Sequence, residues 1–174
     1  MEQKISIALQ MGAAKAEIIP ASGVVLSSTF RDICASNGCG LYGRCWMCPP
    51  DIGPIDELTA KIPQYRHGLL YQTIGQLEDS FDFEGMTEAG KHHAQVSQRI
   101  ESAWPAEEHL HLSCGGCRLC EVCAKRTGEP CRFPDRALPP MEGYGIDVAS
   151  TAKGTSLKYI NGPNTVTFFG IVLF

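Results

Sequence analysis

The sequence predicts a single α/β or α+β domain spanning residues 1–174, with a small mixed sheet, flanking helices and two cysteine-rich metal-binding loops. Three observations lead to this prediction. Segments with strand patterns are interleaved with segments of helical periodicity, which is typical of folds that layer helices on a sheet. A length of 174 residues corresponds to about one domain. All nine cysteines fall within two short segments, 34–50 and 114–134.

The first half of the chain is expected to contain two short helices and two extended segments. Residues 3–14 are compatible with a short helix, and residues 16–26 have the apolar pattern of an extended segment. Prolines bracket a second short helix at 54–62, because proline fits the first turn of a helix and ends a helix further on. Residues 67–74 are bounded by glycines and are typical of a strand.

The second half begins with the clearest helical pattern, at residues 84–104. Steps of three and four residues place on one stripe of this helix Met86, Ala89, His93, Val96, Ile100 and Ala103. A short strand is expected at 108–113, and Asp147 is expected to cap a short helix that stops near Gly154. Residues 165–174 are apolar on nearly consecutive positions, which predicts a strand covered on both faces.

The second cysteine segment is the strongest functional signal. It contains Cys114-x2-Cys117-x2-Cys120-x2-Cys123-x7-Cys131. Consecutive C-x2-C spacings let one loop turn several thiolates toward one centre, as in iron–sulfur ferredoxins. Structural zinc also uses C-x2-C pairs, but usually two pairs with a longer separation. Iron–sulfur ligation is therefore the leading interpretation, with zinc or redox-active thiols as alternatives.

The first cysteine segment is Cys34-x4-Cys39-x5-Cys45-x2-Cys48-Pro49-Pro50. In ferredoxins a proline also follows the remote cysteine ligand. Both segments follow regular elements, so we expect the two loops to converge. Trp46 would help to shield a metal centre from water, although ordinary core packing explains it equally well.

Basic residues accompany the second cysteine segment: Arg118, Lys125, Arg126 and Arg132. Metal–thiolate centres are net anionic, and nearby cations favour the ionised thiolate. We therefore assign Arg118 and Arg132 as cofactor-binding residues. The alternative is that all four are solvated loop charges.

Taken together, the two segments and a downstream Met141-Glu142-x2-Gly145-Ile146-Asp147 stretch resemble a family of small cysteine-rich predicted metal-binding proteins of unknown function, common in anaerobic bacteria and archaea. The resemblance extends from about residue 30 to the end of the sequence. It implies eight metal ligands and leaves out Cys45, and these eight are Cys34, Cys39, Cys48, Cys114, Cys117, Cys120, Cys123 and Cys131.

Eight thiolates match the requirement of two [4Fe-4S] clusters, and neither segment supplies a complete set by itself. By analogy with ferredoxins, one cluster would take Cys48 with Cys114, Cys117 and Cys120, and the other would take the remaining four ligands. One four-iron cluster on the second loop, with zinc or a partly open centre on the first, is a competing arrangement. An iron with a non-protein ligand would indicate an enzyme rather than an electron carrier.

Three histidines and two carboxylates are further candidates. His109 and His111 alternate along the expected strand, so they share a face; they would be ligands or proton donors, or more simply a polar strand edge facing solvent. His93 lies on the apolar helical stripe and is expected to be a hydrogen-bonded core residue. Turn formation and helix capping account for Glu142 and Asp147, with acid–base chemistry as the alternative.

The composition limits the functional class. The formal net charge is −4, with no basic excess that would indicate nucleic-acid binding, and no apolar segment is long enough to span a membrane. Clustered thiols favour a reducing cytoplasm. The leading hypothesis is a cytoplasmic iron–sulfur protein that transfers electrons or serves as an accessory redox subunit. An enzyme with an open-site cluster and a zinc-stabilised interaction module are the alternatives.

The expected partner is a redox protein. Residues 76–111 contain eight acidic and two basic side chains, so this segment is either a docking face for a basic partner or a solvated helix surface. Assembly into a homo-oligomer is compatible with the sequence.

Overall fold

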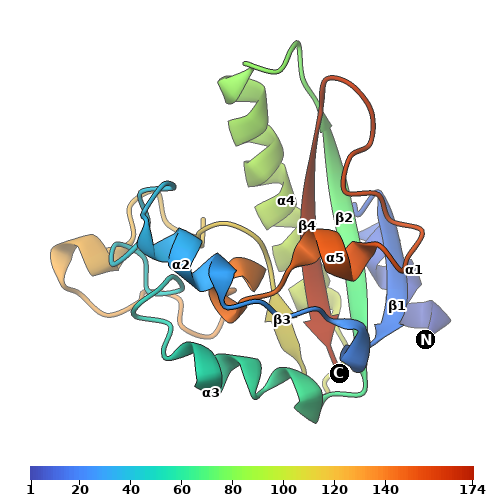
Figure 1. Cartoon of the computed structure of the whole chain (residues 1–174), viewed down its shortest axis with the longest axis horizontal. Helices are drawn as coiled ribbons and strands as arrows, with labels where there is room; N and C mark the ends of the chain where they lie inside the picture. Colours follow the sequence, from blue (N-terminus) through green and yellow to red (C-terminus); the bar gives the residue numbers. More distant parts are fainter.

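Four strands form one antiparallel sheet in the computed structural model, which describes residues 1–174 (Figure 1). The strand order is β1-β2-β4-β3, and every neighbouring pair is antiparallel. The strands are β1 (Lys15–Pro20), β2 (His67–Gln76), β3 (Leu110–Leu112) and β4 (Thr165–Leu173). The expected single domain is confirmed in its α+β form, with uniformly antiparallel strands in place of the mixed directions expected from the sequence.

Strand β4 lies at the centre of the sheet, between β2 and β3. Its last five residues, Phe169 to Leu173, are all buried, which confirms the prediction of a strand covered on both faces. The two faces of a strand alternate along the chain, so Leu69 and Tyr71 on β2 face one core and Leu70 faces the other.

Two helices cover one face of the sheet, α1 (Glu2–Gln10) and α4 (Phe83–Ala103). The Asp82 carboxylate caps α4 by accepting a hydrogen bond of 2.7 Å from the Gly85 amide. The predicted stripe of α4 buries His93, Val96 and Ile100 against β2 and β4. This helix fixes the position of several polar side chains that matter below.

The other face is covered by shorter elements around the larger core. These are α3 (Ile55–Thr59), α5 (Val148–Ala152) and the 3-10 turns η1 (Ala21–Gly23), η2 (Ile62–Gln64) and η4 (Met141–Tyr144). The expected helix at 54–62 is divided between α3 and η2. The Asp147 carboxylate accepts a hydrogen bond of 2.8 Å from the Ser150 amide, which confirms the predicted cap of α5.

The cysteine loops lie beside this layered body together with α2 (Thr29–Ala35) and η3 (Ala124–Thr127), to the left of the sheet in Figure 1. Helix α2 was not expected, because none of its residues is buried and the segment carries no apolar stripe. Two extended segments are shorter than predicted: the strand expected at 16–26 ends at Pro20, and the strand expected at 108–113 spans only Leu110–Leu112. Among all the helices, none combines the length and apolar character needed to cross a membrane.

Candidate metal centre

The two cysteine loops contact each other directly. The indole nitrogen of Trp46 donates a hydrogen bond to the Glu129 carbonyl oxygen at 2.9 Å. A Cβ atom on Gly116 would lie 2.3 Å from Leu41 Cδ1 and 3.8 Å from Cys48 Sγ, so the second loop approaches the first closely at this glycine. The predicted convergence of the loops is confirmed.

Five cysteines line one cavity between the loops. The second loop contributes four of them, and Cys45 of the first loop is the fifth. The other lining residues include Trp46, Met47 and Phe133, which surround the sulfurs with apolar atoms. The cysteines of the second loop are Cys117, Cys120, Cys123 and Cys131. Every cysteine of the chain is a free thiol.

Cationic side chains border this cavity. Arg132 lines it, and a hydrogen bond with Cys120 raises the pKa of the Arg132 guanidinium. The Lys125 ammonium lies 4.2 Å above the Trp46 ring and forms an ion pair with Asp51. Burial raises the pKa of Cys117 to about 11, so a cation or a bound metal is needed to keep its thiolate at neutral pH. The arrangement favours the binding of thiolate-ligated metal.

A second group of cysteines lies on the first loop and at the start of the second. The charges of Cys34 and Cys39 both raise the pKa of Cys48, although its hydrogen bond with Cys45 and burial act more strongly. Burial raises the pKa of Cys34, and the neighbouring charges of Glu142 and Cys39 raise it further. These three thiols therefore interact across the loop, at its contact with Gly116.

Cys114 is grouped with these thiols because the Glu142 charge acts on both Cys114 and Cys34. Burial raises the pKa of Cys114, and the Glu142 charge adds to this effect, as it does at Cys34. The Glu142 carboxylate accepts a hydrogen bond from the Gly115 amide, while its Oε2 atom is buried without a hydrogen-bond partner. Burial raises the pKa of this carboxyl group. Turn formation, the expected role of Glu142, leaves this buried oxygen unexplained.

Cys45 and Cys48 connect the two groups. Both are buried, and their thiols share a hydrogen bond that lowers the pKa of Cys45 and raises that of Cys48. Cys45, which the resemblance leaves out of the ligand set, lines the cavity next to Cys123.

The grouping differs from the one expected by analogy with ferredoxins. That analogy combined Cys48 with Cys114, Cys117 and Cys120, whereas Cys117 and Cys120 line the five-cysteine cavity and Cys114 does not. Cys114 lies two residues after the end of β3, and the chain turns at Gly115, which has a φ of 62°.

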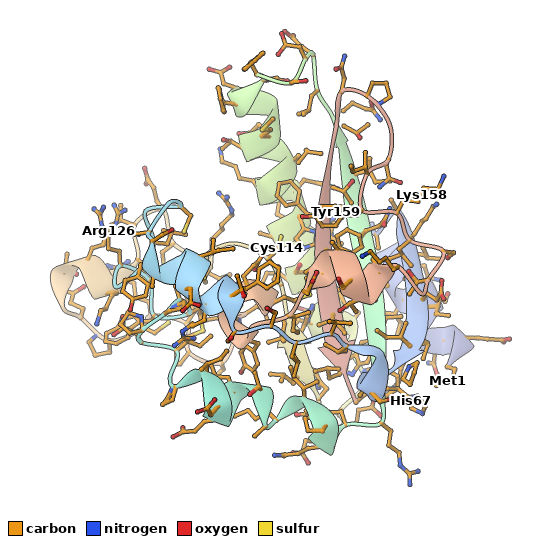
Figure 2. All side chains as sticks on the ribbon, viewed as in Figure 1. Met1, His67, Cys114, Arg126, Lys158 and Tyr159 are labelled. Carbon is orange, nitrogen blue, oxygen red and sulfur yellow. The ribbon has the colours of Figure 1, made fainter.

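The two arginines assigned to the cofactor lie in different places. Arg132 borders the five-cysteine cavity. Arg118 is exposed, and its guanidinium lies against Gly90 of α4, where a Cβ would be 3.4 Å away. From there its charge lowers the pKa of Cys114. Figure 2 shows Arg126 at the far end of the loop region, away from Cys114.

A family of predicted metal-binding proteins (DUF2284) matches residues 17–174 of the chain. The chain belongs to this family. No curated protein and no solved structure matches it. Metal binding is the property predicted for this family. The five free thiols around one cavity are a suitable donor set for a thiophilic metal. In this member, no three His, Cys, Asp or Glu side chains are close enough together to hold a single metal ion.

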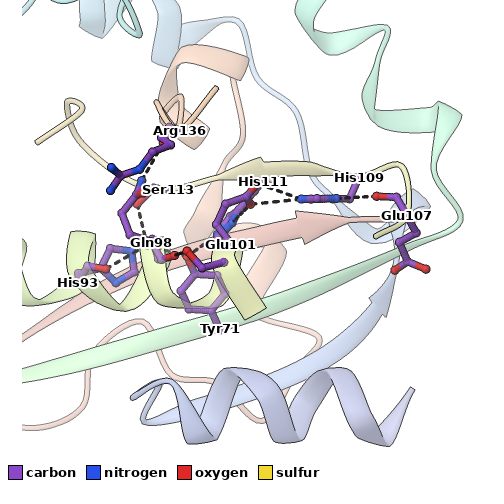
Figure 3. A network of polar contacts seen from close by, with 11 residues as sticks. Tyr71, His93, Gln98, Glu101, Glu107, His109, His111, Ser113 and Arg136 are labelled. Carbon is purple, nitrogen blue, oxygen red and sulfur yellow. Dashed lines mark hydrogen bonds and ion pairs between the residues drawn. The ribbon is translucent and has the colours of Figure 1, made fainter. Parts of the chain in front are cut away.

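A buried polar network next to Cys114 was missed from the sequence (Figure 3). His111 was expected at a solvent-facing strand edge, but it is buried and lies between Glu101 and Tyr71. His109 does share its face, as predicted, and also contacts Glu101. His93 is the expected core residue, with its Nδ1 atom 2.9 Å from the Thr73 hydroxyl. Tyr71, the partner of His111, lies within a largely apolar strand, so no sequence pattern indicated this contact.

Proposed function

We propose that this protein binds iron–sulfur clusters and transfers electrons. The single observation that carries the proposal is the cavity lined by five free cysteines from both loops. Sets of four thiolates bind [4Fe-4S] clusters, and the nine thiols suffice for two such sets. The proposed ligands of the cavity centre are Cys117, Cys120, Cys123 and Cys131, and those of the second centre are Cys34, Cys39, Cys48 and Cys114.

The spacing of the cysteines along the sequence supports a cluster over a single zinc ion. The second loop carries four cysteines at consecutive C-x2-C spacings, as iron–sulfur ferredoxins do with three. Structural zinc usually uses two C-x2-C pairs with a longer separation. A cluster of several irons binds its thiolates at separate iron atoms and so tolerates a wider arrangement.

The electrostatic environment also supports a thiolate-ligated cluster. A cluster with four thiolates is anionic, and Arg132 and Lys125 stand at the cavity where they offset this charge. Apolar neighbours such as Trp46 and Phe133 limit the access of water, which is one determinant of cluster potential.

Anaerobic purification tests the proposal. We expect a brown protein with about eight irons and eight sulfides per chain, as two four-iron clusters require. Reduction by dithionite is expected to bleach the visible absorption, and reoxidation to restore it. A colourless protein with stoichiometric zinc and no iron would overturn the proposal and leave a zinc-stabilised interaction module.

A second candidate function, an enzyme with an open cluster site, is favoured by one observation. The Oε2 atom of Glu142 is buried and unpartnered, and the Glu142 charge acts on Cys34 and Cys114. A carboxylate of this kind is a candidate acid–base group beside a metal centre. Spectroscopic detection of a non-cysteine ligand on one iron would support the enzyme over the carrier.

An electron carrier also needs a partner and a suitable compartment. We propose a redox protein with a basic docking face, which the acidic segment 76–111 would attract. Nine free thiols fit a reducing compartment, and we propose the cytoplasm. A rate of electron exchange that falls as ionic strength rises would support an electrostatically guided encounter.

A further inference from the structure

A continuous chain of hydrogen-bonding groups runs from the surface to the residue before Cys114 (Figure 3). It begins at Glu101, whose Oε2 atom lies 2.8 Å from Nδ1 of His111. Nε2 of His111 lies 2.8 Å from the Tyr71 hydroxyl, which lies 2.7 Å from the Ser97 hydroxyl. The Ser97 hydroxyl lies 3.0 Å from that of Ser113. All four distances are those of good hydrogen bonds.

The chain has one partly exposed end and one buried end. The Glu101 side chain is 26% exposed and that of His109, which contacts it, is 19% exposed. The His111 side chain is 1% exposed, and Tyr71, Ser97 and Ser113 are buried. The position of Tyr71 is fixed by Gly170 on the neighbouring strand, where a Cβ atom would lie 2.2 Å from the Tyr71 ring.

The buried end is electrostatically linked to Cys114. Ser113 precedes Cys114 in the chain, and its backbone is held by a 2.8 Å bond from its amide to the Pro139 carbonyl. Burial raises the pKa of Tyr71, and the Cys114 charge also raises it. A change of charge at Cys114 is therefore felt within the network.

The hydroxyl groups admit two arrangements of their protons. In the first, Ser113 donates to Ser97, Ser97 donates to the His93 carbonyl oxygen 3.0 Å away, and Tyr71 donates to Nε2 of a neutral His111. In the second, Nε2 of His111 donates to Tyr71, Tyr71 donates to Ser97, and Ser97 donates to Ser113. Because Nδ1 donates to the Glu101 carboxylate in both, the second arrangement requires a protonated His111.

We propose that His111 takes up one proton when the metal centre that includes Cys114 is reduced, and that the hydroxyls of Tyr71, Ser97 and Ser113 couple the two events. This inference rests on the proposed electron-transfer function. Added negative charge at Cys114 favours hydroxyl protons that point toward it, which is the second arrangement. The same reversal leaves Nε2 of His111 as a donor and stabilises the imidazolium.

The step balances in electrons and protons. The redox partner protein supplies one electron to the centre, and solvent supplies one proton through the exposed edge formed by Glu101 and His109. Neutral His111 becomes an imidazolium paired with the Glu101 carboxylate. On oxidation the electron returns to a partner, and His111 releases the proton to solvent.

The groups around His111 set the direction of this response. Burial lowers the pKa of His111 and His109 opposes its protonation, whereas Glu101 favours it. His93 on α4 interacts with His111 by like-charge repulsion, and burial lowers the pKa of His93 to about 3, so it stays neutral. Burial thus favours the neutral form of His111, and we assign the opposite effect to added negative charge at Cys114.

Two variants of β2 provide a matched test on the cluster-loaded full chain. Tyr71→Phe removes the hydroxyl that links His111 to Ser97, whereas Thr73→Val removes a hydroxyl from the same face of β2 that contacts His93 instead. Midpoint potentials are measured from about pH 5 to about pH 8, where histidines titrate. Proton uptake on reduction is measured with a pH indicator.

In the wild type and in Thr73→Val, the potential of one centre should rise as pH falls, with up to one proton taken up per electron. Tyr71→Phe should reduce this uptake at least threefold. If Tyr71→Phe does not fold, Ser97→Ala interrupts the same chain and has the same expected result. NMR of the His111 ring in the oxidised protein should show the neutral form at pH 7.

A pH-independent potential in a wild type that carries clusters would overturn this inference and leave the electron-transfer proposal standing. Unchanged proton uptake in a folded Tyr71→Phe or Ser97→Ala variant would overturn it as well. A wild type without iron would overturn both the inference and the proposed function.

Discussion

The indole nitrogen of Trp46 donates a hydrogen bond to the carbonyl oxygen of Glu129, 2.9 Å away, and so ties the first cysteine loop to the second. Trp46 also lines the five-cysteine cavity and carries Lys125 on its ring. One side chain thus closes the cavity, shields it and positions a cation next to it.

Trp46→Phe is expected to loosen the contact between the loops. Losing one hydrogen bond costs about 1 kcal/mol, which corresponds to roughly fivefold in an equilibrium. We expect iron to be lost to a chelator about fivefold faster than in the wild type. Trp104→Phe is the matched control, because the Trp104 indole nitrogen is buried without a partner and packs against α1 and α4. Equal rates in the two variants would contradict the role of Trp46.

The proposed ligand sets predict which cysteines hold iron. Cys120→Ser should lose about four irons per chain, because it removes a ligand of the cavity centre. Cys45→Ser should retain about eight, with a change in potential, since Cys45 contacts Cys48 and Cys123 as a hydrogen-bonding neighbour. Iron analysis together with visible absorption measures both. Loss of iron in Cys45→Ser would mean that the ligand set of the cavity includes Cys45.

Glu142→Gln should raise the reduction potential of the second centre without loss of iron. The substitution removes a negative charge that acts on Cys34 and Cys114 and preserves the shape of the side chain. Potentiometric titration of the two centres measures the shift, and the cavity centre serves as the internal reference. A variant that loses about four irons would instead identify Glu142 as a metal ligand.

The free energy of unfolding is expected to decrease as pH falls, because His93 is buried in its neutral form. Burial lowers the pKa of His93 to about 3, whereas an unfolded histidine has a pKa of about 6.5. The unfolded state therefore binds the proton first, and stability is lost as pH falls from about 6.5 toward about 3. Between pH 7 and pH 5 this residue should remove about 2 kcal/mol from the free energy of unfolding.

The His93→Gln variant should not show the loss of about 2 kcal/mol in the free energy of unfolding between pH 7 and pH 5. Denaturant unfolding of metal-free protein at the two pH values measures the difference, and His111 adds a smaller loss of the same sign because burial lowers its pKa as well. A pH dependence identical in His93→Gln and wild type would show that His93 is not the titrating group.

Gly170→Ala should destabilise the sheet by about 1–3 kcal/mol, because the new methyl group would overlap the Tyr71 ring. Gly154→Ala is the control, since a Cβ atom there meets nothing within 4 Å. Thermal unfolding should show a lower midpoint for Gly170→Ala alone. Comparable midpoints for the two variants would show that the ring can move aside without cost.

Periodic patterns predicted the regular elements that are buried on a defined face. The α4 stripe and the two-sided burial of β4 are of this kind, because burial imposes the pattern. No residue of helix α2 is fully buried, so this helix left no clear periodic pattern. The strand order was not predictable, since it depends on pairings between segments about a hundred residues apart.

The candidate site was predictable in composition but not in arrangement. Cysteine spacing indicated metal ligands, yet it did not show that Cys45 lies in the cavity with Cys117 and Cys123. That placement depends on contacts between two loops far apart in the sequence. The same is true of His111, whose burial depends on Tyr71 and Glu101 from two other elements.

The central position of β4 affects the order of events during biosynthesis. Residues 165–173 pair with both β2 and β3, so the sheet cannot be completed until this last strand has been synthesised. Both cysteine loops precede it in the chain, and Cys114 takes its place only once β3 has paired with β4. The thiols are therefore made before the scaffold that groups them, and we expect metal loading to follow the folding of the complete sheet.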